Sequence, residues 1–454
     1  MAKLVRGLTL TSAASLNIAN MIGTGVFLKA RVMTCNVDSP VVVLAVWLAA
    51  GLLVLAGALC YAELAAMMPE AGGEYVFIRR TYGKRAGFLW GWAFTGITRP
   101  ASIAAQSVST AIFLNIVFDG ALANHLTLVS VTAILLATLI NSYSVQATGA
   151  VATAFTVVKV AVVCAVGVCA FLFSKGDWVH FAMTGAGGAC EAVPAATRGG
   201  LAGIGAAMIG ALWGYQGWAQ FAPMAGEVRD PQRTIPRAFV LAVFVVGALY
   251  LFANASYFYT LTPLEVASVP VASSVATVTL TRLFGAGAAA LMAAGMLVSS
   301  FGALHTGLAP AMRVPYAMAK DGLFFGALNR LSAGGVPVRA GFFAAALASA
   351  LALTGNYDRL TDYAVFSLWL FYAVTASCVI VLRRREPAAE RPYRAVGYPW
   401  VPAVFLVVTV ALLANTLYTQ PVQSLAGLAI IAAGLPFYWY WTREGQGGDS
   451  TAIG

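Results

Sequence analysis

Long apolar runs recur along the whole chain. Glycine, proline and charged residues divide them into twelve, most of them close to the roughly 20 residues that a helix needs to cross a hydrocarbon core of ~30 Å. Only 10% of the residues are charged and 60% are hydrophobic, whereas a soluble chain carries about 25% charged residues. The sequence therefore predicts an all-α polytopic membrane protein. The expected spans are 8–32, 40–66, 86–116, 122–143, 148–174, 199–222, 235–260, 284–310, 338–355, 362–382, 400–418 and 423–441.

The lysines and arginines between these spans are distributed unequally. Most fall on one side if the spans alternate in direction, and the positive-inside rule then places the N- and C-termini in the cytoplasm. The net charge of +10 fits orientation and contact with anionic lipid. It therefore does not indicate a nucleic acid partner.

The first span contains a candidate helix break at Ile22-Gly23-Thr24-Gly25. Each glycine weakens a helix by about 1 kcal/mol relative to alanine, and freed backbone groups are tolerated in lipid only beside protein or water. A restarted helix directs unpaired N–H groups at the break, while the helix before it ends in unpaired carbonyls. This pair of partial charges suits a zwitterion.

The sixth span carries a second candidate break, with Gly210, Gly214 and Gly217 ahead of Pro223. Such glycines can serve close packing alone. Two breaks five helices apart, however, favour an inverted repeat with a substrate between its halves. The expected organisation is a single transporter domain over 1–454. Its parts are a first repeat over 8–174 (helices 1–5), a second over 199–382 (helices 6–10), and helices 11 and 12 over 400–441.

Four motifs resemble those of the amino acid–polyamine–organocation superfamily, and within it the L-type amino acid transporters. They are 20–27 (NMIGTGVF), 60–75 (CYAELAAMMPEAGGEY), 99–102 (RPAS), and 213–218 (WGYQGW) followed by 227–236 (EVRDPQRTIP). The resemblance implies the leucine-transporter-like (LeuT-like) fold with a 5+5 inverted repeat and broken helices 1 and 6.

The resemblance assigns roles to both breaks. Backbone N–H groups of the first break would hold a substrate carboxylate, carbonyls at the half-helix ends would hold its ammonium, and Trp213 would act as a gate. Gln216 is neutral, which argues against a dedicated cationic substrate. The implied substrate-binding residues are Ile22, Gly23, Thr24, Gly25 and Val26 at the first break and Leu212, Trp213, Gly214, Tyr215, Gln216 and Gly217 at the second.

Lys159 lies far from either end of the fifth span. A charge at such depth costs several kcal/mol unless it is paired or neutralised. In sodium-independent relatives a lysine here takes the place of a sodium ion, so Lys159 is expected to contact carbonyls near Ile22 and Gly23, with Ser299 or Ser300 as further partners. The residues leave open whether Lys159 is a fixed charge or a proton carrier.

Three further charged residues and two cysteines also have predicted roles. Arg99 is expected to be structural, at a vestibule, and Glu63 and Arg313 to take part in a cytoplasmic gate, as the resemblance implies. Cys35 and Cys190 fall on the predicted outer side, where oxidation is permitted, and are expected to form a disulfide. The outer loop at 115–126 lacks the cysteine through which animal relatives join a glycoprotein subunit, so no covalent heavy chain is expected.

The combined expectation is a sodium-independent exchanger of neutral L-amino acids that works by alternating access in a plasma (inner) membrane. The short tails fit a bacterial stand-alone permease. A proton-coupled uptake permease that uses Lys159 is the main alternative, and a cationic amino acid or polyamine antiporter is a weaker one. An enzyme is not expected, because no nucleophile–base set or metal cluster is recognisable, and no cofactor or metal is expected either. Paired breaks also suit one enclosed site better than a channel pore.

Overall fold

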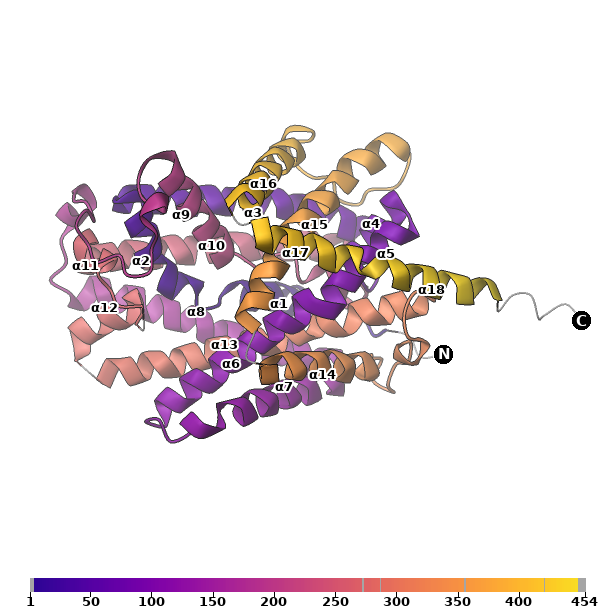
Figure 1. Cartoon of the computed structure of the whole chain (residues 1–454), viewed down its shortest axis with the longest axis horizontal. Coiled ribbons are helices and arrows are strands. Elements are labelled where there is room, and N and C mark those ends of the chain that lie inside the picture. The colour runs from indigo at the N-terminus through magenta and orange to yellow at the C-terminus, as the bar shows by residue number, and fades with distance from the viewer. Residues whose placement is uncertain (1–3, 272, 286, 355–356, 420, 448–454) are drawn as a thin grey trace, which may run out of the picture.

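A computed structural model describes residues 4–271, 273–285, 287–354, 357–419 and 421–447. Its described residues form helices and loops, joined at one place by an isolated bridge between Leu8 and Val228. Figure 1 shows the arrangement. The helices are α1 (Leu10–Met21), α2 (Gly25–Val37), α3 (Pro40–Met67), α4 (Glu74–Tyr82), α5 (Lys84–Ala93), α6 (Arg99–Val117), α7 (Leu126–Tyr143), α8 (Val145–Phe173), α9 (Gly200–Gly214), α10 (Pro231–Thr260), α11 (Pro263–Ala267), α12 (Val275–Phe284), α13 (Gly287–Lys320), α14 (Val338–Thr354), α15 (Tyr357–Arg385), α16 (Trp400–Thr419), α17 (Pro421–Ala432) and α18 (Gly434–Gly447).

Within the described residues, nine helical segments are long and apolar enough to cross a membrane, and three shorter apolar helices accompany them. The nine include the stretches 84–117 and 421–443, each of which combines successive helices. The protein is therefore a multi-pass membrane protein. The expected spans 8–32 and 199–222 are not among the nine, since each is interrupted: the first divides into α1 and α2, and the second ends as α9.

The first interruption lies where the glycines predict it. Thr9 caps the start of α1, accepting a bond from the N–H of Ser12, and the helix ends at Met21. Ile22 is extended, with φ −74° and ψ 94°, so the helical bonding pattern stops there. Helix α2 restarts at Gly25 without a side-chain cap.

The glycines of the two breaks let their backbones meet. A Cβ on Gly25 would lie 2.9 Å from the Cα of Gly214. At the other contact Gly217 adopts a φ of +108°, and a Cβ there would lie 2.5 Å from the carbonyl oxygen of Asn20. Side chains at these positions would therefore separate the two broken helices.

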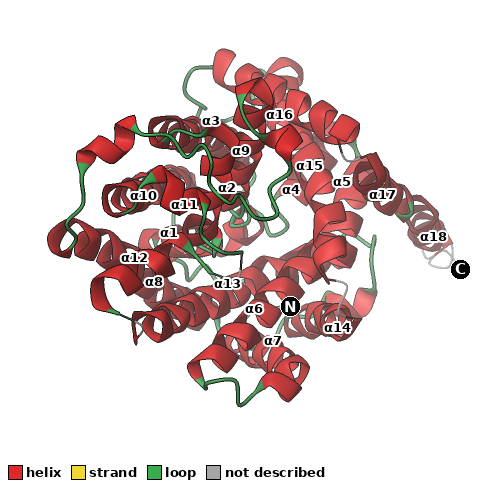
Figure 2. Cartoon of the chain, turned by 60° about the vertical axis from the view of Figure 1, so that its left-hand side comes forward, coloured by secondary structure: helices red, strands yellow, loops and turns green. Residues whose placement is uncertain are grey.

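Helix α1 lies inside the molecule, packed against α8, α10 and α13 (Figure 2). Ala13 and Leu16 on α1 are almost fully buried. By contrast α16, α17 and α18 are peripheral. In each of the segments 400–418 and 421–443, only 17% of the most apolar stretch is buried, against 50% for α13. The additional helices thus leave the centre to the first ten spans.

Three spans differ in detail from the sequence prediction. Helix α13 continues to Lys320 through Pro310 and Pro315, beyond the expected end at 310, because neighbouring groups in a protein interior can compensate for a missing N–H. The expected span 423–441 divides into α17 and α18. Between α5 and α6 runs a π-helical segment, Phe94–Thr98, where the Thr98 hydroxyl donates to the carbonyls of Ala93 and Phe94.

Candidate functional site

A small cavity of about 80 Å³ lies between the two helix breaks. Its lining is mostly polar and combines exposed backbone from both breaks with side chains from α6. The lining residues are Asn20, Met21, Gly23, Thr24, Gly25, Arg99, Ser102, Gln106, Trp213, Gly214, Gln216, Gly217, Gln220 and Ala303.

A second cavity of about 100 Å³ adjoins the first and shares six lining residues with it. It extends along the π-helical segment and α6 towards α15. The residues that it adds are Phe94, Thr98, Ala105 and Leu368. A larger cavity of about 740 Å³ lies between α8, α12 and α13, but apolar side chains line it, so it offers little to a polar solute.

The start of α2 presents donors to the first cavity. Among the described residues, the backbone N–H groups of Gly23, Thr24, Gly25 and Val26 have no hydrogen-bond acceptor. They belong to a helix N-terminus, where the macrodipole adds a partial positive charge. This arrangement suits a carboxylate.

Lys159 of α8 bonds to the end of α1. Its Nζ donates to the carbonyl oxygens of Ala19 at 2.7 Å and Ile22 at 2.8 Å, and the Ser299 hydroxyl of α13 also donates to Ile22, at 3.3 Å. Room for the lysine stem comes from Gly302, where a Cβ would lie 2.9 Å from Lys159 Cε. The lysine, which is 2% exposed, therefore joins α1 to α8 beside α13.

Ser300 does not share this arrangement. Its hydroxyl donates to the carbonyl of Leu297 and accepts from Thr110 on α6. Neighbouring residues on a helix point about 100° apart, so Ser299 and Ser300 face different helices. Of the two serines predicted as alternatives, only Ser299 contacts the carbonyl that Lys159 contacts.

The structure brings most of the predicted binding residues to the first cavity: Gly23, Thr24, Gly25, Trp213, Gly214, Gln216 and Gly217. Ile22, Val26, Leu212 and Tyr215 are outside its lining. Leu212 and Tyr215 lie three residues apart, on one helical face turned away from the cavity. The Tyr215 hydroxyl donates to the carbonyl of Trp47 on α3.

Trp213 borders both cavities and remains 39% exposed. The Nζ of Lys29 lies 4.5 Å from the indole ring centroid, close enough for a cation–π interaction. Lys29 was missed in the sequence analysis. It lies four residues beyond Gly25, hence on the same face of α2, and this spacing could have identified it.

Arg99, which was expected to be structural and at a vestibule, lines both cavities. Its Nε donates to the carbonyl of Gly307 at 2.7 Å, and the residue is 3% exposed. Ser102 and Gln106 follow it at helical spacing and line both cavities with it, a pattern that sequence reasoning could have recognised.

With this geometry established, the chain can be compared with known proteins. The sequence profile of a family described as amino acid permease matches residues 8–439. The chain belongs to this family. The permease is 30% identical over 438 residues to the serine/threonine exchanger SteT of Bacillus subtilis (strain 168), with 94% of each chain covered.

Two further relatives are animal proteins. The permease is 27% identical to the b(0,+)-type amino acid transporter 1 of Mus musculus, over 95% of this chain and 86% of that one. It is also 27% identical to the large neutral amino acids transporter small subunit 2 of Homo sapiens, over 96% and 81%. The family and these relatives are transporters and not enzymes, which confirms the resemblance found in the motifs.

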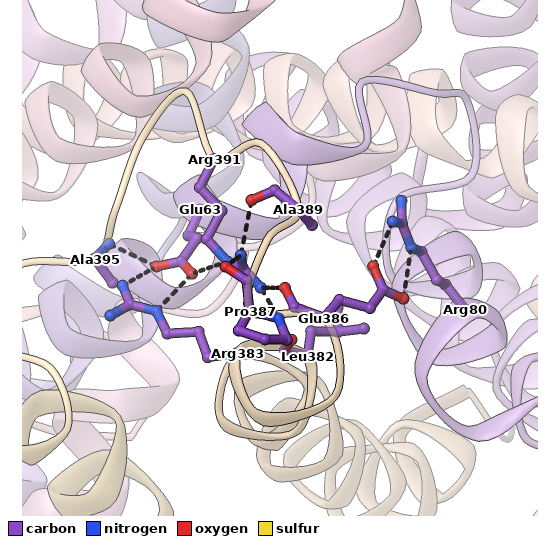
Figure 3. Close-up of polar contacts among 9 residues, drawn as sticks. All are labelled: Glu63, Arg80, Leu382, Arg383, Glu386, Pro387, Ala389, Arg391 and Ala395. Atoms are coloured by element: carbon purple, nitrogen blue, oxygen red, sulfur yellow. Dashed lines mark hydrogen bonds and ion pairs between the residues drawn. The ribbon is translucent and has the colours of Figure 1, made fainter.

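The two residues predicted for a gate in the permease do not contact each other. Glu63 of α3 accepts bonds from Arg383 Nε at 2.9 Å, Arg383 Nη2 at 2.6 Å and the backbone N–H of Ala395 at 2.7 Å (Figure 3). Arg391 Nε also lies 3.5 Å from Glu63. These contacts hold the end of α15 and the loop after it against the end of α3.

Arg313 of α13 instead pairs with Glu227, which ends a 3₁₀ turn at Ala222–Glu227. Its Nε and Nη2 donate to the two carboxylate oxygens at 3.0 and 2.9 Å, and both side chains are fully buried. The Glu227 carbonyl accepts from the N–H of Leu8. This pair therefore joins the segment after the second break to α13 and to the start of α1.

A disulfide joins Cys35 at the end of α2 to Cys190 in the loop before α9, with a Cα–Cα distance of 5.7 Å. Arg31 of α2 donates to the carbonyl of Glu191 in the same loop at 2.6 Å. The N–H of Cys190 donates to the carbonyl of Ala267 in α11. The second half of the first broken helix is thus fastened to this loop and to α11.

Proposed function

We propose that the permease exchanges L-amino acids across a membrane by alternating access and without sodium. The observation that carries the proposal is the contact of Lys159 Nζ with the carbonyls of Ala19 and Ile22. These oxygens, with the Ser299 hydroxyl, are the hard ligands that a cation such as sodium would use. An ammonium already held there removes the need for a metal ion.

Recognition of the amino acid frame would rest on main-chain groups. The unpaired N–H groups at the start of α2 would bind the α-carboxylate. The Ile22 carbonyl already accepts from Lys159 and Ser299, so the α-ammonium would use other carbonyls at the half-helix ends. That of Asn20, which lies against Gly217, is suitable. The similarity to the serine/threonine exchanger and to the two animal transporters supports this substrate class.

The proposed membrane organisation has twelve spans. It adds α14 and the two interrupted helices to the nine long segments, and it keeps the inverted repeat of 8–174 and 199–382. An even number of spans would return the chain to its starting side, so both termini would face the same compartment. The proposed location is a bacterial inner membrane with cytoplasmic termini.

Proton-coupled uptake remains the second candidate. Its support is that Lys159 bonds only to carbonyl oxygens, with no carboxylate in ion-pair contact among the described residues. A lysine without a fixed counter-charge can lose its proton more easily than a paired one.

Counterflow in proteoliposomes separates the two candidates. Vesicles loaded with a labelled amino acid mixture, in sodium-free buffer at equal pH on both sides, should release label only when unlabelled amino acid is added outside. Release that follows a proton gradient and ignores external amino acid would reject exchange. A requirement for sodium would reject the assigned role of Lys159.

A further inference from the structure

The two adjoining cavities have an unusual charge balance. Arg99 lines both of them, and Lys29 lies over the ring of Trp213, which also lines both. No aspartate or glutamate is found in either lining as the structure describes it. A solute in this site therefore meets the guanidinium of Arg99 and no carboxylate in the described linings.

Arg99 has unused hydrogen-bonding capacity. Its Nη2 is buried and has no hydrogen-bond partner among the described residues, while its Nε donates to the carbonyl of Gly307. Among the described residues no carboxylate forms an ion pair with Arg99. A buried cation without a counter-ion is strongly disfavoured, and a bound anion would relieve that cost.

Three glutamines face the same space. Gln106, Gln216 and Gln220 line both cavities. None of the three amide groups makes a hydrogen bond to another described residue. Each can donate through its NH₂ group. They add neutral donors around Arg99 without adding negative charge.

The second cavity continues from the first, away from the unpaired N–H groups of α2. Phe94, Ala105 and Leu368 contribute apolar surface to it, beside Arg99 and Gln106. A ligand bound by its α-carboxylate at the break would therefore extend its side chain between apolar walls towards a guanidinium. The fork of a guanidinium matches a carboxylate in geometry and charge.

From these observations we propose that the permease selects L-amino acids with an acidic side chain, whose carboxylate pairs with Arg99. The proposal rests on the amino acid exchange proposed above and narrows its substrate class. It replaces the expectation of neutral substrates, which came with the resemblance to L-type transporters. Cationic substrates such as lysine or polyamines are disfavoured by the same charges.

Equilibrium binding to the purified full-length protein tests the proposal, with L-glutamate, L-aspartate, L-glutamine, L-norleucine and L-lysine as ligands. Glutamate and norleucine have side chains of similar length and differ mainly in the terminal group. We expect at least one of the two acidic amino acids to bind at least about tenfold more tightly than norleucine, as for one charge-assisted bond, and lysine to bind most weakly. Norleucine binding as tightly as both acidic ligands would overturn the proposal.

Variants of Arg99 separate recognition from a structural role. Arg99→Gln should weaken glutamate binding about tenfold or more and change norleucine binding by less than about threefold. Arg282→Gln, at an exposed pair with Glu265, is the matched control and should change neither. An equal loss for glutamate and norleucine in Arg99→Gln would show a structural role and refute the assignment.

Should Arg99→Gln fail to fold because the Gly307 contact is lost, Gln106→Leu provides a second test. It should weaken glutamate binding more than norleucine binding, and equal effects would again contradict the proposal. Counterflow with the same five amino acids tests the acidic substrate class separately from amino acid exchange itself. Exchange of neutral amino acids without acidic ones would reject the acidic substrate class alone, whereas no exchange with any would reject both.

Discussion

The buried pair of Arg313 and Glu227 offers the sharpest test of how the interior is held together. Both side chains are 0% exposed, and two bonds of 3.0 and 2.9 Å join them. The change Arg313→Met removes the cation and leaves the carboxylate buried without a partner. Breaking such a pair costs about 3–5 kcal/mol, and the lost Nη1 bond to the Ala309 carbonyl places Arg313→Met towards the upper end.

The assay is a double-mutant cycle on the free energy of unfolding, measured by denaturant titration of the detergent-solubilised protein. Arg313→Met and Glu227→Leu should each cost about 3–5 kcal/mol, and the double variant should cost clearly less than the sum, because neither charge is then left alone. The matched control is the exposed pair of Arg282 and Glu265, with side chains 51% and 41% exposed. Breaking it should cost only about 0.2–1 kcal/mol.

Additive losses in the Arg313 and Glu227 cycle would refute the reasoning, since they would mean that the two side chains act independently. A loss below about 1 kcal/mol for Arg313→Met would also refute it, because that is the range of an exposed pair. Exchange activity of the folded single variants adds a second readout. The pair joins the start of α1, the segment after α9 and α13, so its loss should also reduce the exchange rate.

Three further predictions follow from close contacts. Lys159→Met removes two charge-assisted bonds, each of about 1.5–3 kcal/mol, and should lower the exchange rate at least about tenfold. The variant should still elute as a folded, monodisperse protein. Full exchange activity would remove Lys159 from the mechanism. Gly25→Ala should abolish amino acid binding because its Cβ would lie 2.9 Å from Gly214 Cα, whereas Gly23→Ala, with open space around the added atom, should bind nearly normally; equal binding by the two variants would contradict the glycine contact. Cys35→Ser opens a loop of 155 residues and should lower the free energy of unfolding by about 2–4 kcal/mol. The control Cys169→Ser should show no such loss. A reducing agent should reproduce the loss in the unmodified protein.

Local physics explains what could be predicted from the residues alone. Long apolar runs predict membrane helices wherever they occur in a chain, because the hydrocarbon core sets the required length. The glycines at 23 and 25 weaken a helix through their own backbone freedom, so the break between Met21 and Gly25 needed no knowledge of other helices. The cost of burying Lys159 is likewise a property of one residue at one depth.

The relative rotation of the helices could not be predicted in this way. Tyr215 was expected at the binding site and contacts Trp47 instead, whereas Arg99 was assigned to a vestibule and lines both cavities. Each helix can place any face towards the centre, and side chains from several helices must fit together before one rotation is preferred. The choice of partners for Glu63 and Arg313 depended on the same packing.

By itself the sequence determined the helical membrane class, the first interrupted helix and the presence of a buried lysine, because hydrophobicity, glycine flexibility and charge burial are local or nearly local effects. Only the tertiary structure decided that the two breaks touch through Gly25 and Gly214, that Lys159 also bonds to the carbonyl of Ala19, and that Arg99 lines the same cavity. Gly25 and Gly214 are 189 positions apart in the chain, and Lys159 and Ala19 are 140 apart. The geometry of these contacts is set by how whole helices pack together.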